Sequence, residues 1–178
     1  VIIPILKRKK IGQNIRTVGP QSHMAKEGTP TMGGIIFILV ALVMSIILLP
    51  KNLETLILII AMLGYGAIGF IDDFRKLILH QSEGLNPKQK LVLQIILAGL
   101  ITILAFINDK ESITKLLIPF TNYYLPVSVI GIPLMVFIIV GTTNATNLTD
   151  GLDGLLVSVS IPVFITLAII AKTGTNKI

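Results

Sequence analysis

The sequence predicts an all-α integral membrane protein. Of its 178 residues, 53% are hydrophobic and only 13% are charged, whereas charged residues make up about a quarter of a typical soluble domain. Long stretches without any charge recur along the chain, and each is close to the length of a membrane-spanning helix. The absence of cysteine excludes a disulfide framework, a thiol nucleophile and a thiolate metal site.

Five uncharged apolar runs predict five complete transmembrane helices. Each run has 16 to 18 residues and spans roughly 25 Å of helix, so flanking residues have to complete the crossing of a hydrocarbon layer roughly 30 Å thick. Residues 1–6 are the end of an earlier apolar segment, and we expect the whole chain, 1–178, to be part of a single transmembrane domain. The five runs are 32–49, 55–71, 91–107, 125–140 and 155–171.

The basic residues predict which loops face the cytoplasm. Ten of the fifteen lysines and arginines lie in alternate loops that share one side of the membrane, and cytoplasmic loops carry the excess of these residues. Membrane orientation therefore explains the net charge of +6 better than nucleic-acid binding does. The loops predicted to be cytoplasmic are 7–30, 72–90 and 142–153, and those predicted to be extracytoplasmic are 50–54, 108–124 and 172–178.

The loop after the third complete run predicts a short β-hairpin around 113–127 on the outer surface. It contains Ile-Pro-Phe and Tyr-Tyr-Leu-Pro and shows little helical pattern. We assign it no catalytic role.

Two adjacent carboxylates follow the second complete run. Asp72 and Asp73 fall at the predicted C-terminal end of that helix, where exposed carbonyl groups already carry about half a negative charge. A cation is therefore expected beside them. Arg75 and Lys76 can supply it as ordinary surface ion pairs, and the alternative is a magnesium ion or a role as catalytic base.

The next helix is predicted to begin with a cationic turn. Asn86 suits the N-cap and Pro87 the first helical position. Lys88 and Lys90 then lie beside unpaired backbone N–H groups, a combination that favours an anion such as phosphate. The alternative is that both lysines reach toward anionic lipid headgroups.

Two further polar segments border apolar runs on the same predicted face. Segment 26–34, Lys-Glu-Gly-Thr-Pro-Thr-Met-Gly-Gly, is typical of a helix start whose glycines admit a ligand or another backbone, or simply pack closely. Segment 141–154 is rich in Asn, Asp and Gly and is predicted to be a loop. If the following helix starts early, Asp150 and Asp153 share one face of its first turn, and one of them can be its N-cap. Together with the acid and lysine pairs, this loop favours a magnesium-bound diphosphate.

Four motifs together resemble the phospho-N-acetylmuramoyl-pentapeptide transferases, a family of bacterial integral membrane enzymes. They are Gly-Thr-Pro-Thr-Met-Gly-Gly at 28–34, Asp-Asp at 72–73 after Gly-Phe-Ile, Asn-Pro-Lys-Gln-Lys at 86–90, and Asn-Ala-Thr-Asn-Leu-Thr-Asp-Gly-Leu-Asp-Gly at 144–154. The resemblance implies transfer of phospho-MurNAc-pentapeptide from its UDP carrier to undecaprenyl phosphate in peptidoglycan synthesis, with lipid I and UMP as products and Mg²⁺ as cofactor. It also implies a ten-helix, homodimeric protein of the bacterial cytoplasmic membrane, with its active site facing the cytoplasm.

The resemblance further implies roles for individual residues. The catalytic residues would be Asp72, Asp73 and Asp153. The substrate-binding residues would be Lys26, Thr31, Lys76, Lys88, Lys90, Asn147 and Asp150. The metal ligands would be Asp72, Asp73 and Asp150, with the main ligand of the family and a histidine-rich motif beyond Ile178. We therefore expect the 178-residue chain alone to be inactive.

Other functions fit part of the sequence. The polyprenyl-phosphate N-acetylhexosamine-1-phosphate transferases share the Asp-Asp pair and the Asp-rich loop, and are the nearest alternative. A cation-coupled transporter would also have polar breaks beside helices, but it needs ionisable groups near the middle of the bilayer, and all nine acids here lie in predicted loops or at the ends of apolar runs. A purely structural membrane subunit leaves the charged helix ends unexplained.

Overall fold

The structure is a computed structural model that describes residues 33–79, 84–118, 121, 123–151 and 154–175. The chain forms two units, and the boundary between them lies inside a helix, between Val136 and Phe137. The elements in chain order are α2 (Gly34–Leu48), α3 (Leu53–Leu79), α4 (Pro87–Asn108), α5 (Lys110–Thr114), β1 (Lys115–Leu117), β2 (Tyr124–Pro126), η2 (Ser128–Ile130), α6 (Gly131–Thr149) and α7 (Leu155–Thr175).

Most of the helices are long and apolar enough to cross a membrane. In the described part of the chain, α3, α4, α6 together with η2, and α7 meet this condition, and α2 is a shorter apolar helix of 15 residues. Few of their apolar side chains are buried, so these side chains are available to the hydrocarbon interior of a bilayer, where a helix satisfies all its backbone hydrogen bonds. The predicted all-α membrane fold is therefore confirmed. The earlier helix predicted at residues 1–6 lies outside the described residues.

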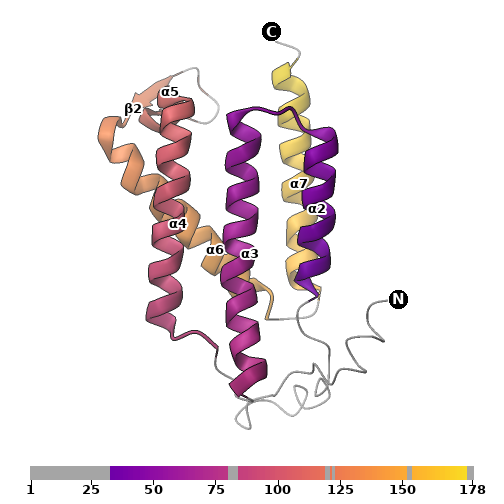
Figure 1. Cartoon of the computed structure of the whole chain (residues 1–178). Coiled ribbons are helices and arrows are strands. Elements are labelled where there is room, and N and C mark those ends of the chain that lie inside the picture. Colours follow the sequence, from indigo (N-terminus) through magenta and orange to yellow (C-terminus); the bar gives the residue numbers. More distant parts are fainter. Residues whose placement is uncertain (1–32, 80–83, 119–120, 122, 152–153, 176–178) are drawn as a thin grey trace. The chain divides into compact units, whose positions relative to one another are not determined.

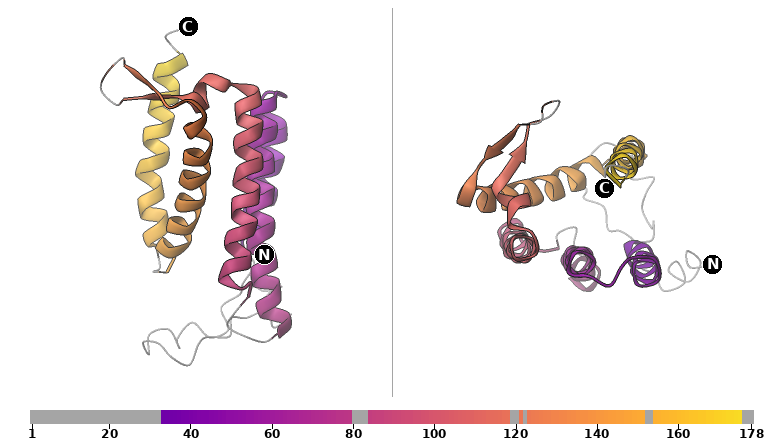
Figure 2. Two further views of the ribbon diagram at one scale, coloured as in Figure 1. Left: turned by 90° about the vertical axis from the view of Figure 1, so that its left-hand side faces the viewer. Right: turned by 90° about the horizontal axis from the view of Figure 1, so that it is seen from above.

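In the first unit, α3 packs between α2 and α4. Figures 1 and 2 show the three helices in a row, with neighbours running in opposite directions. Gly64 faces α4, and a Cβ on it would lie 2.6 Å from a methyl group of Leu97, while a Cβ on Gly66 would meet the terminal methyl group of Ile38 on α2. Small residues at such positions let membrane helices approach closely.

The buried centre of this unit lies along α4. Ala98 and Thr102 are almost fully buried, and the Thr102 hydroxyl donates to the Ala98 carbonyl oxygen at 2.8 Å. Gln94 is also buried, and its backbone carbonyl oxygen accepts a hydrogen bond from the Tyr65 hydroxyl of α3 at 3.3 Å. Polar groups at this depth need such partners because an unpaired buried polar group is costly.

The predicted hairpin around 113–127 is confirmed. Strands β1 and β2 pair antiparallel, with Leu116 opposite Leu125. The predicted loop 108–124 also contains the short helix α5, and Gly131 at the start of α6 packs directly against the Ile113 carbonyl oxygen of α5. We call the end of the α3–α4 pair that adjoins α5 and the hairpin the hairpin end, and the opposite end, which holds the α3–α4 connection, the Asp72 end.

Candidate functional site

Asp72 and Asp73 lie inside α3 and not at its end. The helix continues to Leu79, about two turns beyond the pair, so the predicted loop 72–90 is helical as far as residue 79. Lys76 pairs with both aspartates at spacings of three and four residues, an arrangement that contributes to the stability of a helix. The prediction that these acids lie beside the exposed carbonyl groups of a helix end is therefore wrong. Those carbonyl groups belong to the last turn, which ends at Leu79.

The two carboxylates differ in exposure and in partners. The side chain of Asp72 is only 12% exposed; its Oδ2 lies 2.6 Å from Lys76 Nζ, and its Oδ1 accepts a hydrogen bond from the backbone N–H of Leu85 at 2.8 Å. The side chain of Asp73 is 40% exposed, and its Oδ1 lies 3.2 Å from the same Lys76 Nζ. A buried carboxylate needs such partners because leaving water costs several kcal/mol per ion. Asp72 is thus fixed in place, whereas Asp73 is open to a ligand.

The α3–α4 connection brings a cationic helix start next to this pair. The Asn86 side chain accepts a hydrogen bond from the Lys88 backbone N–H at 3.1 Å, and Pro87 is the first helical residue, so the predicted start of this helix is confirmed. Lys90 is partly buried and close enough to attract the Asp72 carboxylate, whereas Lys88 is exposed. Of the two lysines that the sequence did not separate, Lys90 is the one associated with Asp72.

The backbone N–H of Leu85 is a part of this site that sequence reasoning missed. Leu85 lies thirteen residues after Asp72, and an apolar side chain gives no sign that its backbone binds a carboxylate. The signal that could have pointed to it is Gly84, which precedes the helix N-cap and stands close to Asp72.

Residues 142–149, predicted to be part of a loop, continue α6 in the second unit. Thr143, Asn144 and Thr149 each donate a side-chain hydrogen bond of 2.8 Å to the carbonyl oxygen four residues earlier. These bonds give the polar side chains partners within the helix, so a polar composition does not by itself mark the end of α6. Asn147 lies in this stretch of α6 and is exposed.

Asp150 follows directly on α6 and is exposed. Its backbone N–H donates to the Thr146 carbonyl oxygen at 3.1 Å, as in a last helical turn. Since α7 begins only at Leu155, Asp150 is not in the first turn of that helix, and the early start that would place it on one face with Asp153 does not occur. Both Asn147 and Asp150 belong to the second unit.

Three predicted site residues, Lys26, Thr31 and Asp153, lie outside the residues that the structure describes. Near the first two, the structure describes Gly33 and Gly34 at the start of α2. A Cβ on either glycine would meet no described atom within 4 Å. The close approach predicted for these glycines is therefore not seen within the described part of the chain.

The acids of the site fit a magnesium ion that arrives together with a diphosphate. No group of three Asp, Glu, His or Cys side chains that could hold a metal occurs among the described residues. Mg²⁺ is, however, commonly bound through one or two carboxylates, with water and substrate phosphates completing its octahedron. Asp73 is the accessible carboxylate for such an ion, because both oxygens of Asp72 already bind Lys76 and Leu85. A metal-binding role for Asp150 stays a prediction.

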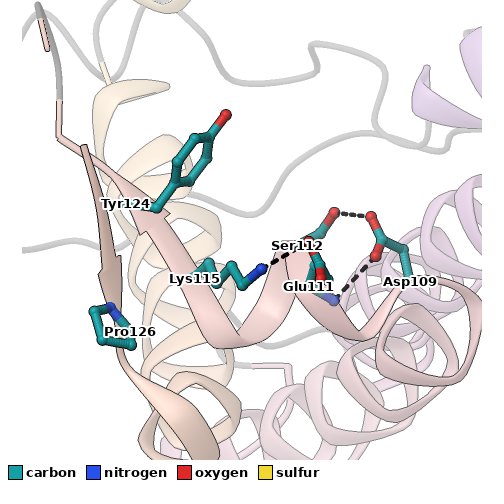
Figure 3. A pocket seen from close by; sticks show the side chains of 6 residues that line it. All are labelled: Asp109, Glu111, Ser112, Lys115, Tyr124 and Pro126. Carbon is teal, nitrogen blue, oxygen red and sulfur yellow. Dashed lines mark hydrogen bonds and ion pairs between the residues drawn. The ribbon is translucent and has the colours of Figure 1, made fainter. Parts of the chain in front are cut away.

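The hairpin end has charged residues of its own, arranged differently (Figure 3). They line an open cavity of about 520 Å³ between α5 and the two strands. Asp109 caps α5 by accepting hydrogen bonds from the Ser112 hydroxyl and from the Glu111 N–H, the latter at 3.0 Å. These bonds lower the pKa of its carboxyl group. Lys115 Nζ lies 2.8 Å from Glu111 Oε2. Each of these bonds joins residues at most four positions apart in the sequence. The charged residues around this cavity are therefore held by local contacts. Its lining residues are Asp109, Glu111, Ser112, Lys115, Tyr124 and Pro126.

Comparison with known proteins confirms the resemblance that the four motifs predicted. Residues 26–38 match the model described as phospho-N-acetylmuramoyl-pentapeptide-transferase signature 1. The phospho-N-acetylmuramoyl-pentapeptide-transferase of Desulfitobacterium hafniense is 54% identical over 158 residues, which are 87% of this chain and 47% of the relative. The protein of the same name from Clostridioides difficile is 41% identical over 97% of this chain and 53% of its own length. For Staphylococcus carnosus the identity is 43%, over 100% of this chain and 57% of the relative.

The chain spans about half the length of the curated relatives it matches. The apolar helices of this chain and its bacterial relatives together indicate a multi-pass bacterial membrane protein. The model described as glycosyl transferase family 4 matches residues 55–178, which include α3 from Thr55 onward, the Lys-bearing start of α4, and the helices α6 and α7. The chain therefore belongs to glycosyl transferase family 4.

Proposed function

We propose that the full-length protein transfers phospho-MurNAc-pentapeptide from its UDP carrier to undecaprenyl phosphate, giving lipid I and UMP. The names of the relatives and the signature at residues 26–38 support this activity. The observation that carries it is the cluster at the Asp72 end, where the Lys76 ammonium group lies between the carboxylates of Asp72 and Asp73 beside the cationic start of α4.

The reaction exchanges one phosphoanhydride bond for another. An oxygen of the lipid phosphate attacks the sugar-proximal phosphorus of the donor and forms a new P–O–P bond. The bond from that phosphorus to the oxygen that bridges it to the uridylate breaks, and UMP leaves with the electron pair of that bond. Little base catalysis is needed, because the second ionisation of a phosphate monoester has a pKa of about 6.

The residues of the site act mainly by position and charge. Lys90 balances negative charge on the diphosphate and on the departing UMP, which is the main form of catalysis in phosphoryl transfer. Lys76 is already paired with Asp72 and Asp73, and it lowers the negative charge that these two carboxylates present to the phosphates. Lys88, which is exposed, contributes to binding of the UDP donor. Asp72 holds Lys76 and the start of α4 in register through its two bonds.

Magnesium, when bound through Asp73 and the donor diphosphate, would neutralise charge on the phosphate oxygens. The excess of Lys and Arg in loops 7–30 and 72–90 supports a cytoplasmic position for the Asp72 end, where a nucleotide donor is available. The remaining proposed site residues, Asn147, Asp150 and Asp153, would bind the nucleotide side of the donor. We propose a homodimer on the resemblance alone.

The test is release of UMP by the full-length protein in nanodiscs supplied with UDP-MurNAc-pentapeptide and undecaprenyl phosphate. We expect release to need both substrates, to stop when EDTA removes divalent ions, and to return with added Mg²⁺. A parallel reaction with UDP-N-acetylglucosamine tests the nearest alternative. Turnover of that donor, without turnover of the pentapeptide donor, would assign the protein to the hexosamine branch.

A further inference from the structure

Gly84 packs so closely against Asp72 that there is no room for a side chain on it. A Cβ built on Gly84 would lie 2.6 Å from Asp72 Oδ1 and 2.9 Å from its Cγ, and closer still to the Asp72 backbone carbonyl oxygen. Two of these three atoms could move with the aspartate side chain, but the carbonyl oxygen belongs to the backbone of α3. Any residue other than glycine must therefore push the connection away from the helix.

The contact at Gly84 sets the geometry of the next two residues. Leu85 follows directly and donates its N–H to Asp72 Oδ1 at 2.8 Å, and Asn86 then caps α4. This hydrogen bond tolerates little displacement, because bonds of this kind weaken steeply as their distance and angle depart from the optimum. Displacing Gly84 by the width of a methyl group would break the bond and move the start of α4, which bears Lys88 and Lys90.

We propose that Gly84 is a positioning residue, which lets Leu85 fix the orientation of the Asp72 carboxylate and sets the distance between that carboxylate and the cationic start of α4. Its effect on catalysis rests on the function proposed above, whereas its effect on the Asp72–Leu85 hydrogen bond does not. Gly84 itself touches no substrate in this proposal and acts only through Asp72 and α4.

Two other glycines of the chain provide matched controls. Gly69 lies one turn before Asp72 on α3, and a Cβ there meets no described atom within 4 Å. Gly131, in contrast, would place a Cβ onto the Ile113 carbonyl oxygen at the hairpin end. Gly69→Ala therefore introduces a methyl group without crowding, and Gly131→Ala introduces comparable crowding of a backbone oxygen far from Asp72.

Hydrogen–deuterium exchange tests the contact without reference to activity. The full-length protein in nanodiscs is compared with Gly84→Ala, Asp72→Ala, Gly69→Ala and Gly131→Ala, and fragmentation of the labelled peptides resolves the Leu85 amide. We expect this amide to exchange about tenfold faster or more in the first two variants and at the wild-type rate in the two controls. An unchanged rate in Gly84→Ala, or a rate equally raised in Gly131→Ala, overturns the proposal.

Steady-state kinetics test the consequence for catalysis. We expect Gly84→Ala to lower kcat about 10- to 100-fold, the effect of displacing a catalytic group by about 1 Å, while the KM for the UDP donor changes less. In the Asp72→Ala background, Gly84→Ala should cause a smaller loss than in the wild-type background, because only its effect on the start of α4 remains. Additive losses would overturn the proposal. Failure of the wild-type protein to turn over the donor would overturn the proposed function and leave the exchange result to decide on the contact.

Discussion

The two ends of the α3–α4 pair contain the same kinds of charged residues and use them differently. At the Asp72 end, a buried carboxylate binds Lys76 on its own helix and the backbone of Leu85, thirteen residues away. At the hairpin end, Asp109 bonds to Ser112 and Glu111 pairs with Lys115, and the Lys115 and Glu111 side chains are 44% and 75% exposed.

The difference shows what separates a candidate site from a surface cluster. Exposed pairs on neighbouring turns contribute little, because water competes for both charges. A buried carboxylate is held by its partners and loses them only at a substantial cost. Burial and a contact between distant parts of the chain, more than the number of charges, make the Asp72 end the better candidate for chemistry.

The largest expected effect comes from neutralising one aspartate at each end. Asp72→Asn keeps an oxygen that can accept the Leu85 hydrogen bond but loses the charge that pairs with Lys76. We expect kcat for UMP release by the full-length protein to fall about 100-fold or more, whereas Asp109→Asn should leave it within about twofold. Similar losses in the two variants would break the comparison.

Two lysines with the same local pairing give the next test. Lys76 and Lys115 each pair with an acid four residues earlier on the chain. We expect Lys76→Met to lower kcat/KM about 10- to 100-fold, as the loss of a hydrogen bond between charged groups would, and Lys115→Met to change it less than about twofold. If both variants kept full activity, the pairing at the Asp72 end would be structural only.

Salt dependence separates the two lysines of the α4 start. Since Lys90 is partly buried near Asp72 and Lys88 is exposed, Lys90→Gln should lower kcat, and Lys88→Gln should mainly raise the KM for the UDP donor, by about fivefold. The effect of Lys88→Gln should shrink as ionic strength rises, because exposed charges are screened. Equal salt dependence in both variants would contradict this assignment.

The smallest expected effect concerns the helix caps at the two ends. Asn86→Ala removes the acceptor for the Lys88 N–H and should lower the free energy of unfolding by about 1 kcal/mol, measured as a lower Tm. Asn86→Asp keeps an acceptor and should keep the Tm. Asp109→Ala removes the cap of α5, which has only five residues, and should lower the Tm less than Asn86→Ala does. The reverse order would show that the hairpin end contributes more to stability than its exposure suggests.

Much of the fold follows from the sequence, because a long uncharged apolar run in a membrane protein indicates a membrane-spanning helix. The helix start at Asn86 and the hairpin around 113–127 also follow from local residue types. The helix ends are harder to predict, because charged and polar residues are typical of loops but also occur inside helices. In α3 the helix continues past Ile71, and Lys76 pairs with both aspartates. In α6 the polar side chains of Thr143, Asn144 and Thr149 bond to the helix backbone.

The candidate site was predicted in its residue types and not in its contacts. The sequence identifies Asp72, Asp73, Lys76 and Lys90. The structure pairs the first three directly, and the charge of Lys90 acts on Asp72 more weakly than that of Lys76. The bond from Leu85 to Asp72 could not be predicted, because it depends on how closely the α3–α4 connection returns to the helix. That distance depends on the space beside Gly84. A glycine marks a place where the chain can approach closely, but it does not say which group lies beside it.

The packing of Gly131 against Ile113 bears on the order of events during biosynthesis. The hairpin precedes Gly131 in the chain and is therefore synthesised first. The contact between Ile113 and Gly131 can form only after the first turn of α6 has been made. We expect the hairpin end to reach its final state only after insertion of α6, whereas the contact between Asp72 and Leu85 can form as soon as the first turn of α4 has left the ribosome.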